Sequence, residues 1–214
     1  MSSYSLEGSN IMVEINLKNI IVVQSILKYS KLSRDGLDRL REFLKSSGFF
    51  IQQDVSSGIL FGASYNSSLL ATDEELNLKS KDLEDLNNVL QRIINFLREE
   101  IKVSDLNLYF EEIAEFESRK DPIKVVEKMY DKSFFKNAEL EISPMGIGFG
   151  IAINKEFPIV LRIEAILRPD IKGYSVSTSV STKEKFDDMI EYCSKIHEDV
   201  LTVLRKIENP KYMT

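Results

Sequence analysis

Three glycines in the segment SPMGIGFGIAIN, at positions 143–154, raise the possibility of phosphate chemistry. Gly146, Gly148 and Gly150 alternate with large apolar residues. A phosphate-binding loop needs its glycines in a turn between a strand and a helix, and in a Walker loop a lysine and a hydroxyl residue follow. Here no such pair follows, and another strand pattern comes next. The alternation therefore predicts a strand with one bulky and one bare face, and a bare face allows a backbone, helix or ligand to approach closely.

Cys193 and His197 are the only cysteine and the only histidine, and they lie four residues apart in a predicted helix. That spacing places both on one helix face, where they would form either a thiol–imidazole pair or half of a metal site. A nucleophile needs an orienting third group, and zinc needs more ligands than this sequence offers. Because cysteine is also among the most frequently buried residues, we interpret both as core residues. We expect no catalytic residue, no metal and no cofactor.

Carboxylates, which acid–base or metal chemistry would require, gather in two places. The first group shares one face of a predicted strand: Glu111, Glu115 and Glu117. The second group is a run of consecutive acidic residues: Asp73, Glu74 and Glu75. No EF-hand spacing accompanies either group. A solvated strand face is the favoured interpretation.

Hydroxyl side chains alternate along YSVSTSVST, where Ser175, Ser177, Ser179 and Ser181 share one face. Such a row can bind a polar ligand, but it is also typical of a solvent-facing or edge strand. No GxSxG elbow marks a hydrolase serine. We therefore predict a ligand or partner face made of Gly146, Gly148, Gly150, Ser175, Ser177 and Ser179.

Basic residues cluster between positions 28 and 45, and Lys31, Arg34, Arg39 and Arg41 are the candidates for a phosphate or nucleic-acid contact. Acidic residues interleave with them and leave a local net charge of +3. The pattern is typical of a helix surface with i,i+3 and i,i+4 ion pairs. The whole chain carries a net charge of -6, which argues against a general nucleic-acid binder.

The 214 residues suffice for a hydrophobic core without disulfides, and a single cysteine excludes an intrachain disulfide. That usage fits a reducing compartment. We see no signal-peptide pattern and no apolar stretch long enough to cross a bilayer. We therefore expect a soluble, cytoplasmic protein with no membrane contact.

Hydrophobic periodicity predicts a strand–helix–sheet–helix order that occurs twice. The first half has strands at 11–17 and 19–30, a helix at 33–48, a hairpin at 49–65, a strand within 66–80 and a long helix at 82–101. The second half has a strand at 105–117, a helix from 121, strands within 139–154, 157–168 and 173–182, and a closing helix at 183–207.

A fixed offset of 103 residues places the apolar stripe of the first long helix on that of the closing helix, for example Leu90 on Cys193. This register favours an internal duplication, although two amphipathic helices can also match by coincidence. The predicted units are 11–102 and 103–208, between flexible tails at 1–10 and 209–214. The predicted fold class is α+β: an antiparallel sheet with two long helices on one face and its other face available.

A duplicated unit of sheet plus long helix resembles the plan of TATA-binding-protein-like folds, and a sheet with a long C-terminal helix is similar to SecB-like chaperones. The resemblance concerns architecture alone, and a fold does not give a function. No aromatic wedge for kinking DNA is identifiable in this sequence.

The favoured function is a non-enzymatic binding or assembly protein whose sheet presents a face to a protein partner or to its own copy as a homodimer. The alternative is a small-molecule-binding protein or enzyme with a pocket between the sheet and a long helix. A nucleic-acid binder using the basic cluster is a second alternative.

Overall fold

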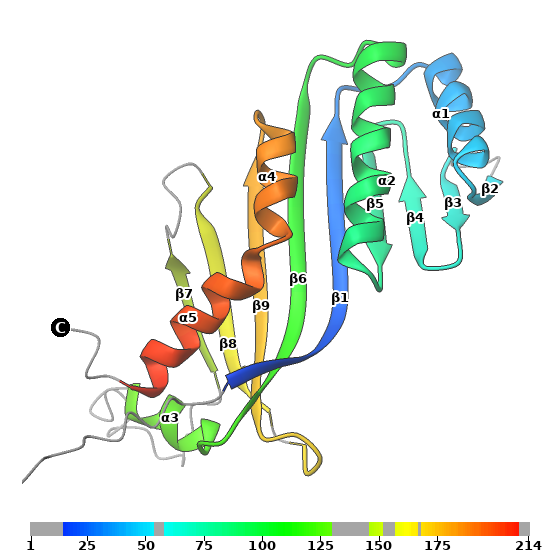
Figure 1. Cartoon of the computed structure of the whole chain (residues 1–214). Helices are drawn as coiled ribbons and strands as arrows, with labels where there is room; N and C mark the ends of the chain where they lie inside the picture. Colours follow the sequence, from blue (N-terminus) through cyan, green and yellow to red (C-terminus); the bar gives the residue numbers. More distant parts are fainter. Residues whose placement is uncertain (1–14, 54–57, 130–145, 152–156, 167, 210–214) are drawn as a thin grey trace, which may run out of the picture.

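The computed structural model describes residues 15–53, 58–129, 146–151, 157–166 and 168–209. Within them, nine strands form one antiparallel sheet in the order β2-β3-β4-β5-β1-β6-β9-β8-β7 (Figure 1). This confirms the α+β class. The elements are β1 (Ile15–Tyr29), α1 (Arg34–Ser46), β2 (Phe50–Gln53), β3 (Leu60–Ala63), β4 (Ser67–Ala71), β5 (Glu75–Ser80), α2 (Leu83–Phe96), the π-helix η1 (Leu97–Ile101), β6 (Leu106–Ser118), α3 (Pro122–Met129), β7 (Gly146–Ile151), β8 (Ile159–Ala165), β9 (Gly173–Thr182), α4 (Phe186–Cys193) and α5 (Ile196–Glu208).

The two longest strands, β1 and β6, pair at the centre of the sheet, from Ile15 with Ser118 to Tyr29 with Leu106. Going outward from this pair, β5 and β9 come next, then β4 and β8, then β3 and β7, and β2 lies outside β3. The last strand of each half therefore lies beside its first strand. The two halves of the sequence occupy opposite halves of one sheet.

The prediction of separate strands at 11–17 and 19–30 was wrong, although residues 11–14 lie outside the described residues. Within the described residues, one strand of 15 residues begins at Ile15, and its register shifts between Leu17 and Asn19 and again between Ile20 and Val22. A bulge interrupts the period-two alternation of side chains without ending the strand. The interrupted alternation explains why one strand resembled two.

Helix α1 begins and ends, and helix α3 begins, where the sequence signals predict. Ser33 is the N-cap of α1, and its hydroxyl accepts a hydrogen bond from the Gly36 N–H at 3.1 Å. Gly48 follows the helix with φ of +93°, the left-handed conformation that favours glycine after a helix end. Asp121 caps α3 by accepting from the Ile123 N–H at 3.1 Å.

The helices lie on one side of the sheet (Figure 1). Leu86, Leu90 and Ile93 of α2 are buried against it, as is the matching stripe of Met189 and Cys193 on α4. Side chains of β6 alternate between the two faces of the sheet as predicted. The apolar side chains on the face toward the helices are buried: Leu106, Leu108, Phe110, Ala114 and Phe116.

The closing helix is not continuous, which corrects the prediction of a second long helix over 183–207. It divides into α4 and α5, separated by Ser194 and Lys195. The Lys195 N–H donates to the Tyr192 carbonyl at 2.9 Å, which closes a turn at the break. The axis changes direction there (Figure 1). Because a sheet twists, a straight helix of this length would leave it, whereas two shorter helices keep both apolar stripes on the strands.

Candidate binding surface

The face of the sheet opposite the helices is formed by the alternate residues of every strand. On β6 these are Tyr109, Glu111, Ile113, Glu115 and Glu117, whose neighbours along the strand point into the core. The described helices lie on the other side (Figure 1). We call this surface the open face.

The six residues predicted as a ligand or partner face come together on the open face. Each glycine of β7 pairs with a residue of β8 that pairs in turn with a serine of β9. The three rows are Gly146–Glu164–Ser175, Gly148–Arg162–Ser177 and Gly150–Val160–Ser179. The glycine segment is thus an ordinary strand, and its glycines continue the row of serines.

Two of these glycines differ in the space around them. A Cβ built on Gly148 meets nothing within 4 Å, and the residue is exposed. A Cβ on Gly146 would lie 2.7 Å from Cγ of Glu164, and Glu164 forms an ion pair with Arg162 at 2.6 Å. The glycine face of β7 is therefore open at Gly148 and covered by a neighbouring side chain at Gly146.

Exposed apolar side chains on the open face were missed at the sequence level. Phe50 is 70% exposed, Val160 54%, Phe61 47% and Leu70 36%. The signal was present, because Phe61 and Leu70 alternate with the buried Leu60 and with Leu69 and Ala71. Alternation shows which residues share a face, but it does not show which face the helices leave uncovered.

Charges of both signs are distributed over the open face, and several are paired. Arg168 forms an ion pair with Glu115 at 2.9 Å, and Lys28 lies 3.8 Å from Glu75. Glu111 accepts hydrogen bonds from the Gln24 amide and from the Ser177 hydroxyl. The surface is therefore mixed, with hydroxyls, amides, apolar side chains and few unpaired charges.

The predicted basic contact residues do not form a free cationic patch. Lys31 pairs with Asp73 at 3.2 Å and Arg39 with Glu100 at 3.2 Å. Arg41 lies between two carboxylates of its own helix, Asp38 and Glu42, both at 3.1 Å. Arg34 is exposed at the start of α1. Exposed pairs add little stability, but they cancel the positive charge that a nucleic acid would require.

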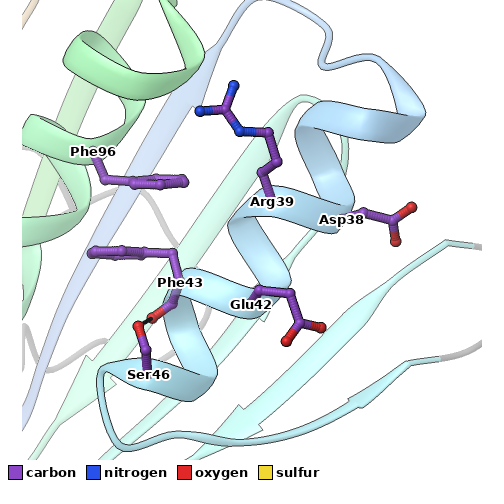
Figure 2. A pocket seen from close by; sticks show the side chains of 6 residues that line it. All are labelled: Asp38, Arg39, Glu42, Phe43, Ser46 and Phe96. Carbon is purple, nitrogen blue, oxygen red and sulfur yellow. Dashed lines mark hydrogen bonds between the residues drawn. The ribbon is translucent and has the colours of Figure 1, made fainter.

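An open pocket of about 520 Å³ lies between α1 and α2, where Phe43 and Phe96 stack with ring centroids 4.2 Å apart (Figure 2). Asp38, Arg39 and Glu42 also contribute to the lining of the pocket. A second pocket of about 600 Å³ lies where the two halves meet. Ile20 of the bulged part of β1, Asn87 of α2 and Ser194 of the helix break contribute to its lining.

Glu112 was missed at the sequence level, although it lies on the inward face of β6 in the segment FEEIAEFE. Only 1% of its side chain is exposed, and its Oε1 lies 2.7 Å from His197 Nε2 on α5.

Cys193 is buried near this pair. Burial, followed by the charge of Glu112, raises the pKa of the Cys193 thiol. A thiol held neutral in this way is a poor nucleophile, which supports a core role for Cys193.

Cys193 is expected to resist a thiol reagent such as DTNB in the native protein and to react as one thiol after denaturation. Because its pKa is raised in the folded state, an unfolded thiol ionises first as pH increases. The contribution of the neutral, buried thiol to the free energy of unfolding is therefore complete below about pH 8.5 and is lost progressively above it. Rapid labelling of the native protein at about pH 8 would show that the thiol is accessible and would contradict its burial.

No group of three or more histidine, cysteine, aspartate or glutamate side chains suited to a metal ion occurs in the described residues. None of the helices in the same part of the chain is long and apolar enough to span a bilayer.

The sequence matches no model of a known protein family, and no curated protein matches it.

Proposed function

We propose that this chain is a non-enzymatic binding or assembly protein that docks a protein partner or a second copy of itself on the open face. One observation carries the proposal: the helices cover one side of the sheet, and the other side exposes Phe50, Phe61, Leu70 and Val160. Large side chains that are left in water on a broad surface favour association, because burying them removes apolar area from water.

The mixed chemistry of the open face also supports a protein partner. Protein interfaces that form and dissociate are about as apolar as the rest of a protein surface, with aromatic residues enriched at the centre. Phe61 and Tyr109 lie in one cross-strand row with Leu70 and Ile26, and the row ends at Ser181. Aromatic and aliphatic side chains there are flanked by hydroxyls and paired charges.

We also propose that the chain is a fused duplication, with units at 11–102 and 103–208. The mirrored order of the strands about β1 and β6 supports this interpretation. So does the burial of matching stripe residues, such as Leu86 with Met189 and Leu97 with Val200, at an offset of 103. The single cysteine supports a reducing compartment such as the cytoplasm.

A small-molecule site in the second pocket is the alternative that a specific observation favours. The pocket lies over β1 beside the helix break, and Oδ1 of Asn87 is buried there without a hydrogen-bond partner in the described residues. Such an oxygen favours a ligand that donates a hydrogen bond. Thermal stabilisation by a ligand, lost on replacing Asn87 with leucine, would support this alternative over the open face.

Replacing Phe61 with aspartate is expected to weaken association by about 10- to 100-fold, since a charge would have to be buried in the interface. The residue is half exposed in the free chain, so the substitution leaves the fold intact. Light scattering over a concentration series, or titration with a partner, measures the effect.

Tyr65 is the matched control, because it is fully exposed in the turn between β3 and β4. The Tyr65→Asp variant should associate like the wild type. Equal association of the Phe61 and Tyr65 variants would place the interface elsewhere and refute the proposal.

A further inference from the structure

We propose that the occupant of the open face is a second copy of this chain, packed face to face about a two-fold axis that passes over Gln24. This inference rests on the function proposed above and names the partner. It is carried by one row of residues that crosses all nine strands and is self-complementary about its middle. Gln24 of β1 is the fifth of the nine residues in this row.

One half of the row runs from Gln24 towards β2. Each residue is the cross-strand partner of the one before it: Lys79, Ser68, Ala63 and Phe50. The other half runs from Gln24 towards β7: Glu111, Ser179, Val160 and Gly150. All nine positions belong to the open face.

A two-fold axis parallel to the strands, and lying over β1, reverses the order of the row in the second copy. One step from the axis, Lys79 then faces Glu111 of the second copy. Two steps away, Ser68 faces Ser179, and a hydroxyl meets a hydroxyl. Gln24 faces its own copy, where two amides can exchange hydrogen bonds.

The outer steps match by size. Three strands from the axis, the small Ala63 faces the exposed Val160. Four strands away, the 70% exposed ring of Phe50 faces Gly150, which has no side chain. Large residues therefore meet small ones at both outer positions, as an interface without gaps requires.

Charge supports the same register. In the described part of the chain, neither Lys79 nor Glu111 forms an ion pair with a charged residue of the same chain, whereas Arg162 and Arg168 of the open face do. A pairing between copies would give each of the two an oppositely charged partner. Each copy carries a net charge of -6, so the two repel at long range. Local complementarity at the centre of the interface then decides the orientation.

The area fits a stable dimer. Eight steps between strands of about 4.8 Å span roughly 38 Å, and six residues along a strand cover roughly 20 Å. The product is near the roughly 800 Å² per partner of a standard interface. Packed sheets lie about 10 Å apart and cross at about 30°, so the contacts nearest the axis define the register.

Charge reversal tests the register directly. Lys79→Glu and Glu111→Lys should each raise the dimer dissociation constant about 100-fold, because either substitution places like charges together at two symmetric contacts. An equimolar mixture of the two variants should recover wild-type affinity as a heterodimer, since both contacts are then opposite in charge. The double variant, which restores the pairs in a homodimer, is the control for folding. Native mass spectrometry and light scattering measure all four samples.

Cross-linking tests the position of the axis. Gln24→Cys should give a covalent dimer with a short bismaleimide, because the two residues face each other. Ser68→Cys should not, since its copies would lie roughly 19 Å apart, four strand spacings of about 4.8 Å. Cys193 is buried and should not compete.

The outcomes separate this inference from the proposed function. If Phe61→Asp disrupts association but the mixture of charge variants does not recover, the open face is the interface and the proposed register is wrong. A chain that stays monomeric at high concentration would overturn the second copy as occupant, whatever else binds the face. Recovery in the mixture, with cross-linking at position 24 alone, would establish the inference.

Discussion

Replacing His197 with leucine is expected to lower the free energy of unfolding by about 1–3 kcal/mol, the usual cost of leaving a buried polar group without its partner. Glu112 is 1% exposed and its Oε1 contacts His197 at 2.7 Å. Neither its Oε2 nor His197 Nε2 forms a hydrogen bond of good geometry in the described residues, so the two side chains meet as a close polar contact. Without the imidazole, Oε1 of Glu112 would remain in the core with neither this polar contact nor water.

The location of the pair increases the expected effect. Glu112 lies on β6 between Phe110 and Ala114, which belong to different hydrophobic clusters. On the helical side, His197 adjoins Ile196 of the first cluster, three residues before Val200 of the second. The pair therefore joins α5 to the centre of the sheet where the two cores meet. Its loss should weaken the connection between the halves as well as the local packing.

A double-mutant cycle provides the control. Replacing Glu112 and His197 together with leucine removes both polar groups, and such replacements are often neutral or stabilising. We expect the double variant to recover most of the stability lost in His197→Leu, as measured by urea denaturation. Additive losses in the two single variants would show that the contact contributes little energy and that each residue acts through its own packing.

Replacing Gly173 with alanine is expected to cost about 3 kcal/mol or more, the upper range for overpacking. A Cβ at this position would lie 1.8 Å from the Phe116 carbonyl oxygen. That atom belongs to the backbone of β6, so no side-chain rotation relieves the clash. Strand β9 would have to move away from β6, and the pairing of Gly173 with Glu117 would be disturbed.

Gly148 is the matched control, because it is also a strand glycine and a Cβ there meets nothing within 4 Å. Gly148→Ala should leave the free energy of unfolding unchanged or raise it by about 0.5–1 kcal/mol, since alanine loses less conformational entropy. Equal denaturation midpoints for the two alanine variants would contradict the close approach of β9 to β6.

Local features of the fold could be predicted from the sequence because neighbouring residues determine them. Ser33 and Asp121 cap helices with their own side chains, and the alternation around Phe110 reflects a strand with one buried face. The glycines and serines were correctly placed on strands rather than in a phosphate loop. Each of these signals depends on a few consecutive positions.

Features that depend on distant contacts could not be predicted. The pairing of β1 with β6 joins segments about ninety residues apart, and the bulges near Leu17 and Ile20 form only against that partner. The break at Ser194 follows from the twist of the sheet, and the sequence of the helix does not encode that twist. Glu112 could not be told apart from the other glutamates of its strand, because its partner His197 lies 85 positions along the chain. The predicted solvated face was also wrong at Glu115, which is 4% exposed and is covered by the distant Arg168.

The central claim is that the open face is buried on association, and hydroxyl-radical footprinting tests it most directly. Oxidation rates at Phe61 and Tyr109 of the open face would be compared between the associated wild type and the Lys79→Glu variant, with Tyr65 as a fully exposed internal reference. The claim predicts slower oxidation at Phe61 and Tyr109 in the associated protein and equal rates at Tyr65. Oxidation rates that do not differ between the two proteins at any of the three residues, or protection confined to the helical side of the sheet, would contradict the claim.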